Sequence, residues 1–225
     1  GSERLMQGKR NAPTLLDHLI QTASFCPDDP SVRLAGLLHD VGKLTTREIT
    51  AEGRTIFHGH ELESARLAEI TMQRLRFSTH STARVSSLIQ HHMSHGPISL
   101  KTIRRWLAEH DEQWVRDLLA LRRADHYASG GSTAPWLDEA QADLETILAE
   151  EGALHLSDLD LDGEDVMRVL GVPPGPVVGY VLQRLHNLVL EDPALNKRET
   201  LESYLPALAA EFTEGDTHPL APRRV

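Results

Sequence analysis

Candidate metal-binding side chains are spread over five short segments of the chain. They are imidazoles and carboxylates, which bind divalent ions such as Mn²⁺, Fe²⁺, Ni²⁺, Zn²⁺ and Mg²⁺ to differing degrees. An ion held by such groups with one coordination position open activates a water molecule for hydrolysis. In chain order, the candidates are His18, His39-Asp40, His58 and His60, His91-His92, and Asp125.

The set is more informative than any single member. One histidine among 13 is by default a surface or core residue. Asp125, however, lies in an otherwise apolar stretch, where a buried carboxylate is costly unless a cation or another partner meets it. If these groups formed a metal-free polar cluster, each would need a partner within the protein. We therefore expect a shared metal site, and we expect the remaining histidines at the surface or in the core: His80, His95, His110, His126, His155, His186 and His218.

Two helices are expected to position the first candidates. Apolar residues recur at helical spacing over residues 14–24, and again over residues 31–38, where Ser31 is a candidate N-cap. The second helix would deliver His39 and Asp40 at its carboxyl end, with Gly42 as a helix stop. Adjacent residues inside a helix point about 100° apart, so both side chains reach one centre most easily at a helix end.

The rest of the chain also predicts helices, which makes the expected fold class all-α. Between residues 45 and 57, β-branched residues flank a glycine, so a short hairpin or loop is expected there. The helices at 79–92, 99–109 and 112–127 are expected to pack around one core. Further helices are predicted at 61–76, 135–149, 164–170, 177–191 and 197–209, with prolines at 173, 174 and 176 as a break.

Composition suggests a domain boundary at Ser129-Gly130-Gly131-Ser132. We expect residues 13–128 to form the metal-binding core and residues 129–214 a smaller C-terminal helical appendage. Gly1-Ser2 looks like the remnant of a cleaved tag, so residues 1–12 are expected to be an extension outside the fold. Residues 215–225 are expected to be a disordered tail.

Bulk composition restricts the class of protein. Cys26 is the single cysteine, which excludes an internal disulfide framework and favours a reducing compartment such as the cytoplasm. No apolar run approaches the roughly 18 residues that span a bilayer, so no membrane partner is expected. The net charge of −10 disfavours wholesale wrapping of nucleic acid, although a local basic face is compatible with it.

The order of the candidates resembles a known family. The HD superfamily of metal-dependent phosphohydrolases is defined by a His, then a His-Asp pair, then a distant Asp, and His18, His39-Asp40 and Asp125 match that order. Leu37-Leu38-His39-Asp40-Val41-Gly42-Lys43 is a close fit to the family's central motif. The resemblance implies an HD-domain helical bundle with one or two divalent ions.

Other stretches resemble the HD and C-terminal region of bacterial tRNA nucleotidyltransferases, the CCA-adding enzymes. The similarity covers most of the chain from His18 to about Leu201, but the chain has no Gly-Ser nucleotidyl-transfer loop and no paired-Asp motif of the polymerase head. The stretches are residues 57–61, 74–77, 89–93, 163–167, 170–176 and 195–199.

The resemblance assigns roles to these positions. His18, His39, Asp40 and Asp125 are the implied ligands of a first ion. His60, His91 and His92 resemble the added ligands of two-metal members, with Asp40 as a bridge. The expected catalytic residues are His39, Asp40 and Lys43, and Lys43 also contacts phosphate. The other expected substrate-binding residues are His58, Arg74, Arg76 and Arg122.

Two functions follow, and the sequence does not decide between them. The first is hydrolysis of phosphomonoesters or 2′,3′-cyclic phosphodiesters of nucleotides or RNA ends, with Mn, Ni, Fe, Co, Mg or Zn as the ion. The second is a tRNA-binding module of a split or truncated tRNA nucleotidyltransferase without hydrolysis of its own. The metal and the oligomeric state stay open.

Overall fold

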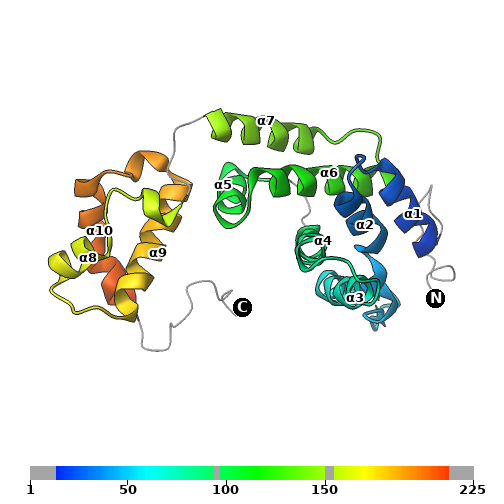
Figure 1. The fold of residues 1–225 in the computed structure, drawn as a ribbon, viewed down its shortest axis with the longest axis horizontal. Coiled ribbons are helices and arrows are strands. Elements are labelled where there is room, and N and C mark those ends of the chain that lie inside the picture. Colours follow the sequence, from blue (N-terminus) through cyan, green and yellow to red (C-terminus); the bar gives the residue numbers. More distant parts are fainter. Residues whose placement is uncertain (1–13, 94–96, 150–154, 213–225) are drawn as a thin grey trace. The chain divides into compact units, whose positions relative to one another are not determined.

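The computed structural model describes residues 14–93, 97–149 and 155–212, and it confirms the all-α prediction (Figure 1). The expected extension at 1–12 and the expected tail at 215–225 lie outside the described residues. The helices are α1 Leu15–Phe25, α2 Pro30–Leu38, α3 His60–Arg74, α4 Thr79–His91, α5 Leu100–Glu109, α6 Glu112–Ala128, α7 Pro135–Ala149, α8 Gly163–Leu170, α9 Pro176–Glu191 and α10 Arg198–Glu211. Short elements join them: 3₁₀ turns η1 Val41–Leu44, η2 Leu156–Asp158 and η3 Pro193–Leu195, and strands β1 Glu48–Ile49 and β2 Thr55–Ile56.

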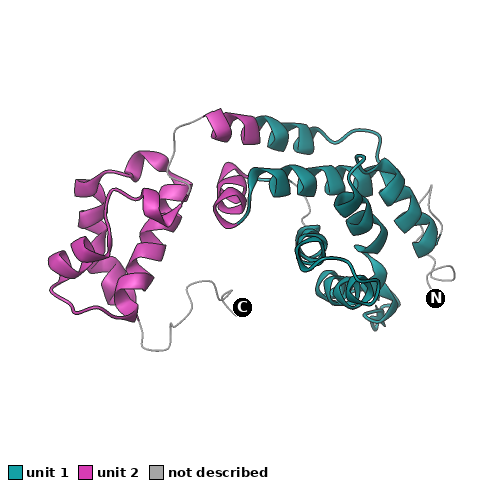
Figure 2. Ribbon diagram, in the orientation of Figure 1, with its two compact units in different colours: residues 1–98, 110–142 teal, residues 99–109, 143–225 magenta. Residues whose placement is uncertain are grey.

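The chain divides into two compact units (Figure 2). Unit 1 contains residues 1–98 and 110–142, and unit 2 contains residues 99–109 and 143–225. The expectation that the helix at 99–109 shares a core with its sequence neighbours is wrong, because α5 belongs to unit 2 and packs against α9 there. An ion pair between Lys101 and Glu191 joins these two helices. The domain boundary at residue 129 stays a prediction.

In unit 1, α1, α2, α4 and α6 pack around one another, and α3 packs along α4. Polar caps fix the helix starts: Thr14 and Asp17 form a capping box at α1. Asp29, not Ser31, caps α2, because its carboxylate accepts hydrogen bonds from the backbone nitrogens of Ser31 and Val32 at 2.8 and 3.0 Å. Pro30 then occupies the first helical position, where its missing N–H costs nothing.

Gly42 has a different role from the helix stop that the sequence suggested. Helix α2 already ends at Leu38, with His39 as its C-cap, and Gly42 lies within η1. A Cβ at Gly42 would lie 2.5 Å from the carbonyl oxygen of His60 and 2.7 Å from the nitrogen of Ser64. The Gly42 nitrogen also donates to Ser64 Oγ at 2.9 Å. The absent side chain therefore lets the loop after His39-Asp40 contact the first turn of α3 directly.

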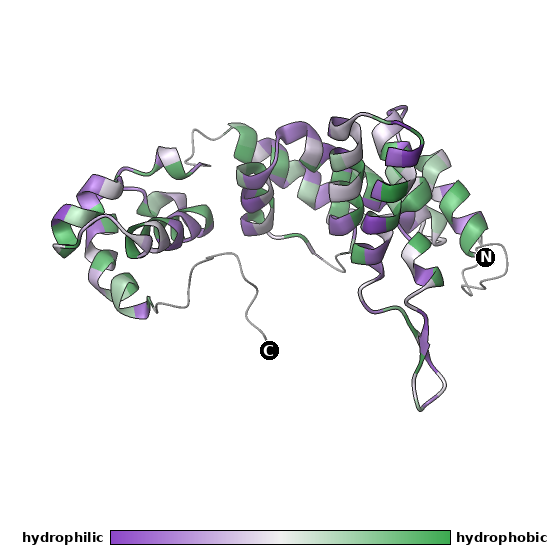
Figure 3. Ribbon diagram, turned by 60° about the horizontal axis from the view of Figure 1, so that its bottom comes forward, coloured by the Kyte–Doolittle hydropathy of each residue, from purple (hydrophilic) through white to green (hydrophobic). Residues whose placement is uncertain are grey.

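The segment between η1 and α3 forms a short antiparallel hairpin, as expected. Glu48 pairs with Ile56 and Ile49 with Thr55. Figure 3 shows this hairpin extending away from the helices of unit 1 as a largely hydrophilic ribbon. Beyond it, Phe57 packs on Leu15 and Leu19 of α1, which anchors the chain just before α3.

Unit 2 has an apolar core of its own, and side-chain hydrogen bonds join residues 158–160 to residues 196–198. Asn196 donates to the Asp158 carbonyl at 2.9 Å and accepts from the Asp160 nitrogen at 2.9 Å. Asp160 in turn accepts from the Arg198 nitrogen at 3.0 Å, at the start of α10. The buried core residues are Leu159, Leu161, Val166, Val178, Val181, Leu185, Val189, Leu201, Leu205 and Leu208.

Within the described ranges, every helix is too short or too polar to span a bilayer.

Candidate metal centre

Asp40 lies at the centre of a buried group of four imidazoles that come from four helices of unit 1. Its Oδ2 is 3.4 Å from Nε2 of His18, on α1, and 3.4 Å from Nε2 of His39, at the end of α2. Its Oδ1 is 3.1 Å from Nε2 of His60, the first residue of α3, and 3.7 Å from Nε2 of His92, which follows α4. All five side chains are buried.

These contacts form two ligand sets that share one carboxylate. In the first set, His18, His39 and Asp40 offer donor atoms within 4.8 Å of one another, and in the second, Asp40, His60 and His92 do so. Asp125, on α6, borders the first set: its Oδ1 is 3.1 Å from His18 Nε2 and 3.7 Å from His39 Nε2. The arrangement suits one or two divalent ions with Asp40 between them.

Three of the imidazoles are oriented by backbone carbonyls. Nδ1 of His39 lies 2.8 Å from the oxygen of Gly36, and Nδ1 of His60 lies 2.8 Å from that of Phe57. Nδ1 of His92 lies 2.6 Å from the oxygen of Ile89. A carbonyl only accepts, so each Nδ1 donates a proton to its carbonyl and each Nε2 is directed toward Asp40. This second contact is typical of histidines that bind metals.

The carboxylates of the cluster favour positive charge on the groups that face them. Burial by itself lowers the pKa of His39, but Asp40 and Asp125 outweigh it and raise that pKa to about 10. Burial also opposes ionisation of Asp40, yet the facing imidazoles hold its pKa well below the usual range. For His92, burial wins and lowers the pKa, assisted by the charge on His39. A proton on His39 thus stabilises carboxylates that a cation would stabilise further.

Two buried polar atoms support a fit to a cation. Asp40 Oδ1 and His60 Nε2 are both buried and face each other at 3.1 Å without forming a hydrogen bond. Each such atom costs about 1–3 kcal/mol in desolvation if nothing meets it. They lie on the side of Asp40 that belongs to the second ligand set. A divalent ion between carboxylate and imidazole would satisfy both, so these residues fit the metal that the sequence implies.

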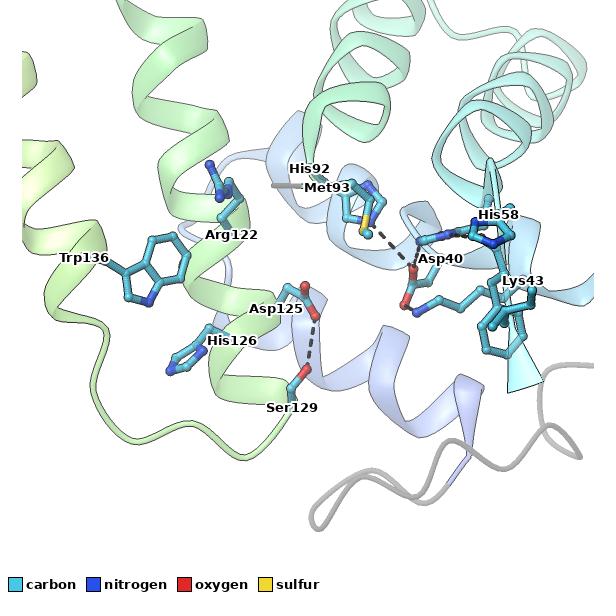
Figure 4. Close-up of a pocket in the computed structure, with 13 residues that line it drawn as sticks. Asp40, Lys43, His58, His92, Met93, Arg122, Asp125, His126, Ser129 and Trp136 are labelled. Atoms are coloured by element: carbon cyan, nitrogen blue, oxygen red, sulfur yellow. Dashed lines mark hydrogen bonds and ion pairs between the residues drawn. The ribbon is translucent and has the colours of Figure 1, made fainter. Parts of the chain in front are cut away.

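A cavity of about 640 Å³ opens beside the cluster (Figure 4). Asp40, His60, His92 and Asp125 contribute to its wall, so a molecule in the cavity would contact the candidate ligands. Its volume falls within the roughly 300–1,000 Å³ of sites for small organic ligands. The other lining residues are Lys43, Ile56, Phe57, His58, Met93, Arg122, His126, Ser129 and Trp136.

Lys43 places a positive charge at the edge of the cluster. Its Nζ donates to Asp40 Oδ2 at 2.5 Å, and it also lies 5.6 Å from the centre of the Phe57 ring. The side chain is 14% exposed and lines the cavity. His58 lines the same cavity but is exposed and lies outside both ligand sets.

The structure brings three predicted site residues to other places. His91 lies outside both ligand sets, because its ring packs edge-on against Trp114, 5.1 Å away. Arg74 and Arg76 are exposed at the carboxyl end of α3, whereas His60 begins that helix. Fifteen residues at about 1.5 Å each put roughly 20 Å between the two ends. Neither arginine lines the cavity, whereas Arg122 does.

Among the lining residues that were not predicted as site residues, two carry nitrogen-containing aromatic rings. His126 was expected to be an ordinary histidine, and Trp136 was not considered, yet both line the cavity. His126 follows Asp125 directly, and Trp136 is the second residue of α7, where it is half-buried. A tryptophan at a helix start just after a glycine-rich turn was the available signal.

Comparisons with known proteins agree with this geometry. The family model described as "HD domain" matches residues 15–149. The chain is 36% identical over 162 residues to the CC-adding tRNA nucleotidyltransferase of Thermus thermophilus, which covers 71% of this chain and 36% of that protein. It is also 36% identical over 176 residues to the A-adding tRNA nucleotidyltransferase of Deinococcus radiodurans, covering 76% and 40% respectively. The matches thus span less than half the length of these relatives. No solved structure gives a significant match.

Proposed function

Because the chain belongs to the HD domain family, a superfamily of metal-dependent phosphohydrolases, we propose that it hydrolyses phosphate esters of nucleotides or RNA ends. The candidate substrates are phosphomonoesters and 2′,3′-cyclic phosphodiesters. One observation carries the proposal: Asp40 lies between two pairs of imidazoles at the wall of a cavity large enough for a small organic ligand.

The residues that would hold the metal divide into two groups around Asp40. His18, His39 and Asp40, with Asp125 beside them, would hold a first ion, and Asp40, His60 and His92 a second. When bound, a divalent ion lowers the pKa of a water molecule toward 7 and offsets negative charge on phosphoryl oxygens. The backbone carbonyls of Gly36, Phe57 and Ile89 keep three of these imidazoles in the orientation that metal binding requires.

The chain itself supplies the remaining positive charge for a phosphate. Lys43 lies at one side of the cavity and Arg122 at another (Figure 4). A Lys ammonium binds phosphate as a point charge, and the Arg122 guanidinium, across the cavity, adds positive potential. Both groups lie in a partly enclosed site, where electrostatic attraction is stronger than in water.

The decisive experiment combines metal content with activity. Protein purified without chelator should contain a transition metal, chelation should abolish hydrolysis of a nucleotide phosphomonoester, and Mn²⁺, Ni²⁺ or Co²⁺ should restore it. Asp40→Asn keeps the size of the side chain but removes its charge, so we expect it to lose metal and at least about 100-fold in activity, more than loss of an outer contact causes. The matched control is His80→Ala, on the exposed surface of α4. Full activity in Asp40→Asn would refute the proposal.

Binding of tRNA is a second candidate function, and one observation favours it. The tRNA nucleotidyltransferase of Deinococcus radiodurans matches 176 residues, more than the residues 15–149 that the HD domain accounts for. The likeness therefore includes sequence outside the HD match. The expected result is salt-dependent tRNA binding that survives Asp40→Asn and weakens in Arg105→Ala, an exposed position of unit 2. Tight tRNA binding without any metal-dependent turnover would favour this candidate over hydrolysis.

A further inference from the structure

The cavity beside the metal centre is larger than a phosphate group needs. At about 640 Å³ it extends from Asp40 and Lys43 to a wall that the candidate ligands do not explain. Figure 4 shows that wall as Arg122 and His126, from α6, and Trp136, from α7, with Asp125 between it and Asp40.

Several contacts within unit 1 fix the position of the wall. Nε2 of His126 donates to the carbonyl oxygen of Thr133 at 2.7 Å, and this bond closes the turn between α6 and α7. A Cβ at Gly131 would lie 2.1 Å from the same nitrogen, so the turn packs tightly on the His126 ring. Arg123 pairs with Asp138 at 2.7 Å and joins the two helices once more. Trp136 is thus presented by a rigid segment.

The side chains of the wall are planar and contact one another. The guanidinium carbon of Arg122 lies 5.2 Å from the centre of the Trp136 ring, and the ring of His126 approaches edge-on at 6.1 Å. Arg122 is 4% exposed, so its plane is held in place, whereas Trp136 is half-buried and retains free surface. Planar aromatic and guanidinium groups are the surfaces on which nucleobases stack.

The two sides of the cavity therefore suit the phosphate and the base of a nucleotide. Lys43 and the imidazoles attract an anionic phosphate, and Trp136 offers an aromatic face away from them. We propose that Trp136 is a specificity-determining residue that stacks on the nucleobase of a nucleotide substrate, with Arg122 holding the indole in position. This inference rests on the proposed function, and it assigns the substrate class by the base rather than by the phosphate alone.

The experiment compares a ligand with a base and a ligand without one. In Trp136→Leu, which keeps an apolar side chain but removes the ring, KM for 2′-AMP should rise about 10-fold to 100-fold, the usual loss for one stacked base. KM for ribose 5-phosphate should stay within about twofold of the parent value, and kcat for both should be little changed. Trp136→Phe, which restores a ring, should recover most of the affinity for 2′-AMP.

Binding measurements separate this inference from the proposed hydrolysis. If the chain hydrolyses nothing, calorimetric titration with AMP and with inorganic phosphate still tests the wall, since only AMP binding should weaken in Trp136→Leu. Phe77→Ala, an exposed aromatic position outside the cavity, is the matched control. Equal changes for 2′-AMP and ribose 5-phosphate, or no change for either, would overturn the inference, and so would failure of Trp136→Phe to restore affinity.

Discussion

At the scale of single residues, Asp40 accounts for the arrangement of the whole cluster. Both of its oxygens face imidazoles, two on each side, and its backbone lies between the end of α2 and the start of η1. A carboxylate at that junction can be reached from α1, α2, α3 and the end of α4. This explains why the adjacent His39-Asp40 pair serves one centre although neighbouring residues inside a helix diverge.

A metal ion in the first ligand set would have to compete with Lys43 for one carboxylate oxygen of Asp40. Its ammonium donates to Asp40 Oδ2, the oxygen that also faces His18 and His39. In Lys43→Gln, we expect Mn²⁺ to bind a few-fold more tightly, because the competing cation is gone. We expect KM for a phosphomonoester to rise about 10-fold, because a charged phosphate contact of roughly 1.4 kcal/mol is lost. Calorimetric Mn²⁺ titration and steady-state kinetics measure the two effects.

Lys43→Arg is the control for charge. It keeps the cation, so Mn²⁺ affinity should stay near the parent value and KM should recover in part. Loss of bound Mn²⁺ in Lys43→Gln would contradict this account, since it would mean that Lys43 orients Asp40 rather than competing for it.

Arg76 has a backbone conformation that should lower the stability of the fold. Its φ of 60° lies in the left-handed region, which residues with a Cβ adopt at a cost of about 1–2 kcal/mol. Arg76→Gly should raise the free energy of unfolding by about 1 kcal/mol, and Arg74→Gly, inside α3, should lower it by about as much. Urea denaturation distinguishes the two signs. Because neither residue lines the cavity, KM should not change, and a higher KM in both variants would instead support the role that the sequence suggested.

At the scale of elements, the sequence predicted which helices exist better than which faces they present. The segment 79–92 was expected as a helix carrying two ligands at its end, and α4 does end at His91. Yet two adjacent residues at a helix end cannot both face one point unless the backbone turns between them. His92, the C-cap, faces Asp40, while the ring of His91 packs on Trp114. Periodicity does not encode that choice, because it depends on where α6 places Trp114.

The contact between η1 and α3 is the element-scale feature that the site depends on most directly. A methyl group at Gly42 would meet backbone atoms of His60 and Ser64, which cannot move aside as a flexible side chain can. Gly42→Ala should therefore destabilise unit 1 by roughly 1–3 kcal/mol, the range for overpacking, and should weaken Mn²⁺ binding because His60 is displaced. Thermal unfolding and calorimetric titration measure both effects.

Gly179→Ala provides the matched comparison. A Cβ at this position of α9 meets nothing within 4 Å, so the substitution should stabilise its helix by about 0.5–1 kcal/mol and leave metal binding unchanged. If Gly42→Ala were as well tolerated as Gly179→Ala, the close approach of η1 to α3 would not be what holds His60 in place.

At the scale of the whole molecule, the order of helices and the class of fold were accessible from the sequence, but the placement of α5 in unit 2 was not. Composition pointed to Ser129–Ser132 as a flexible boundary, whereas the structure closes this turn with a bond from His126 to Thr133. Glycines were read as flexibility, yet Gly131 is needed because the His126 ring occupies the space of a side chain. Trp136 was overlooked for the same reason: its place in the cavity depends on that closed turn.

Both candidate ligand sets, as found in the described ranges, come from unit 1, and this confines the expected effect of metal. A ligand that binds only the folded state stabilises it by about 2.7 kcal/mol at 100 times its Kd, which corresponds to roughly 100-fold slower exchange from globally opened states. Amide hydrogen exchange with saturating Mn²⁺ should therefore slow in α1, α2, α4 and α6 and stay unchanged in α8–α10. Asp40→Asn should show no response in either unit. A Mn²⁺ effect of equal size in both units, or one that persists in Asp40→Asn, would place the ion somewhere other than at the cluster around Asp40.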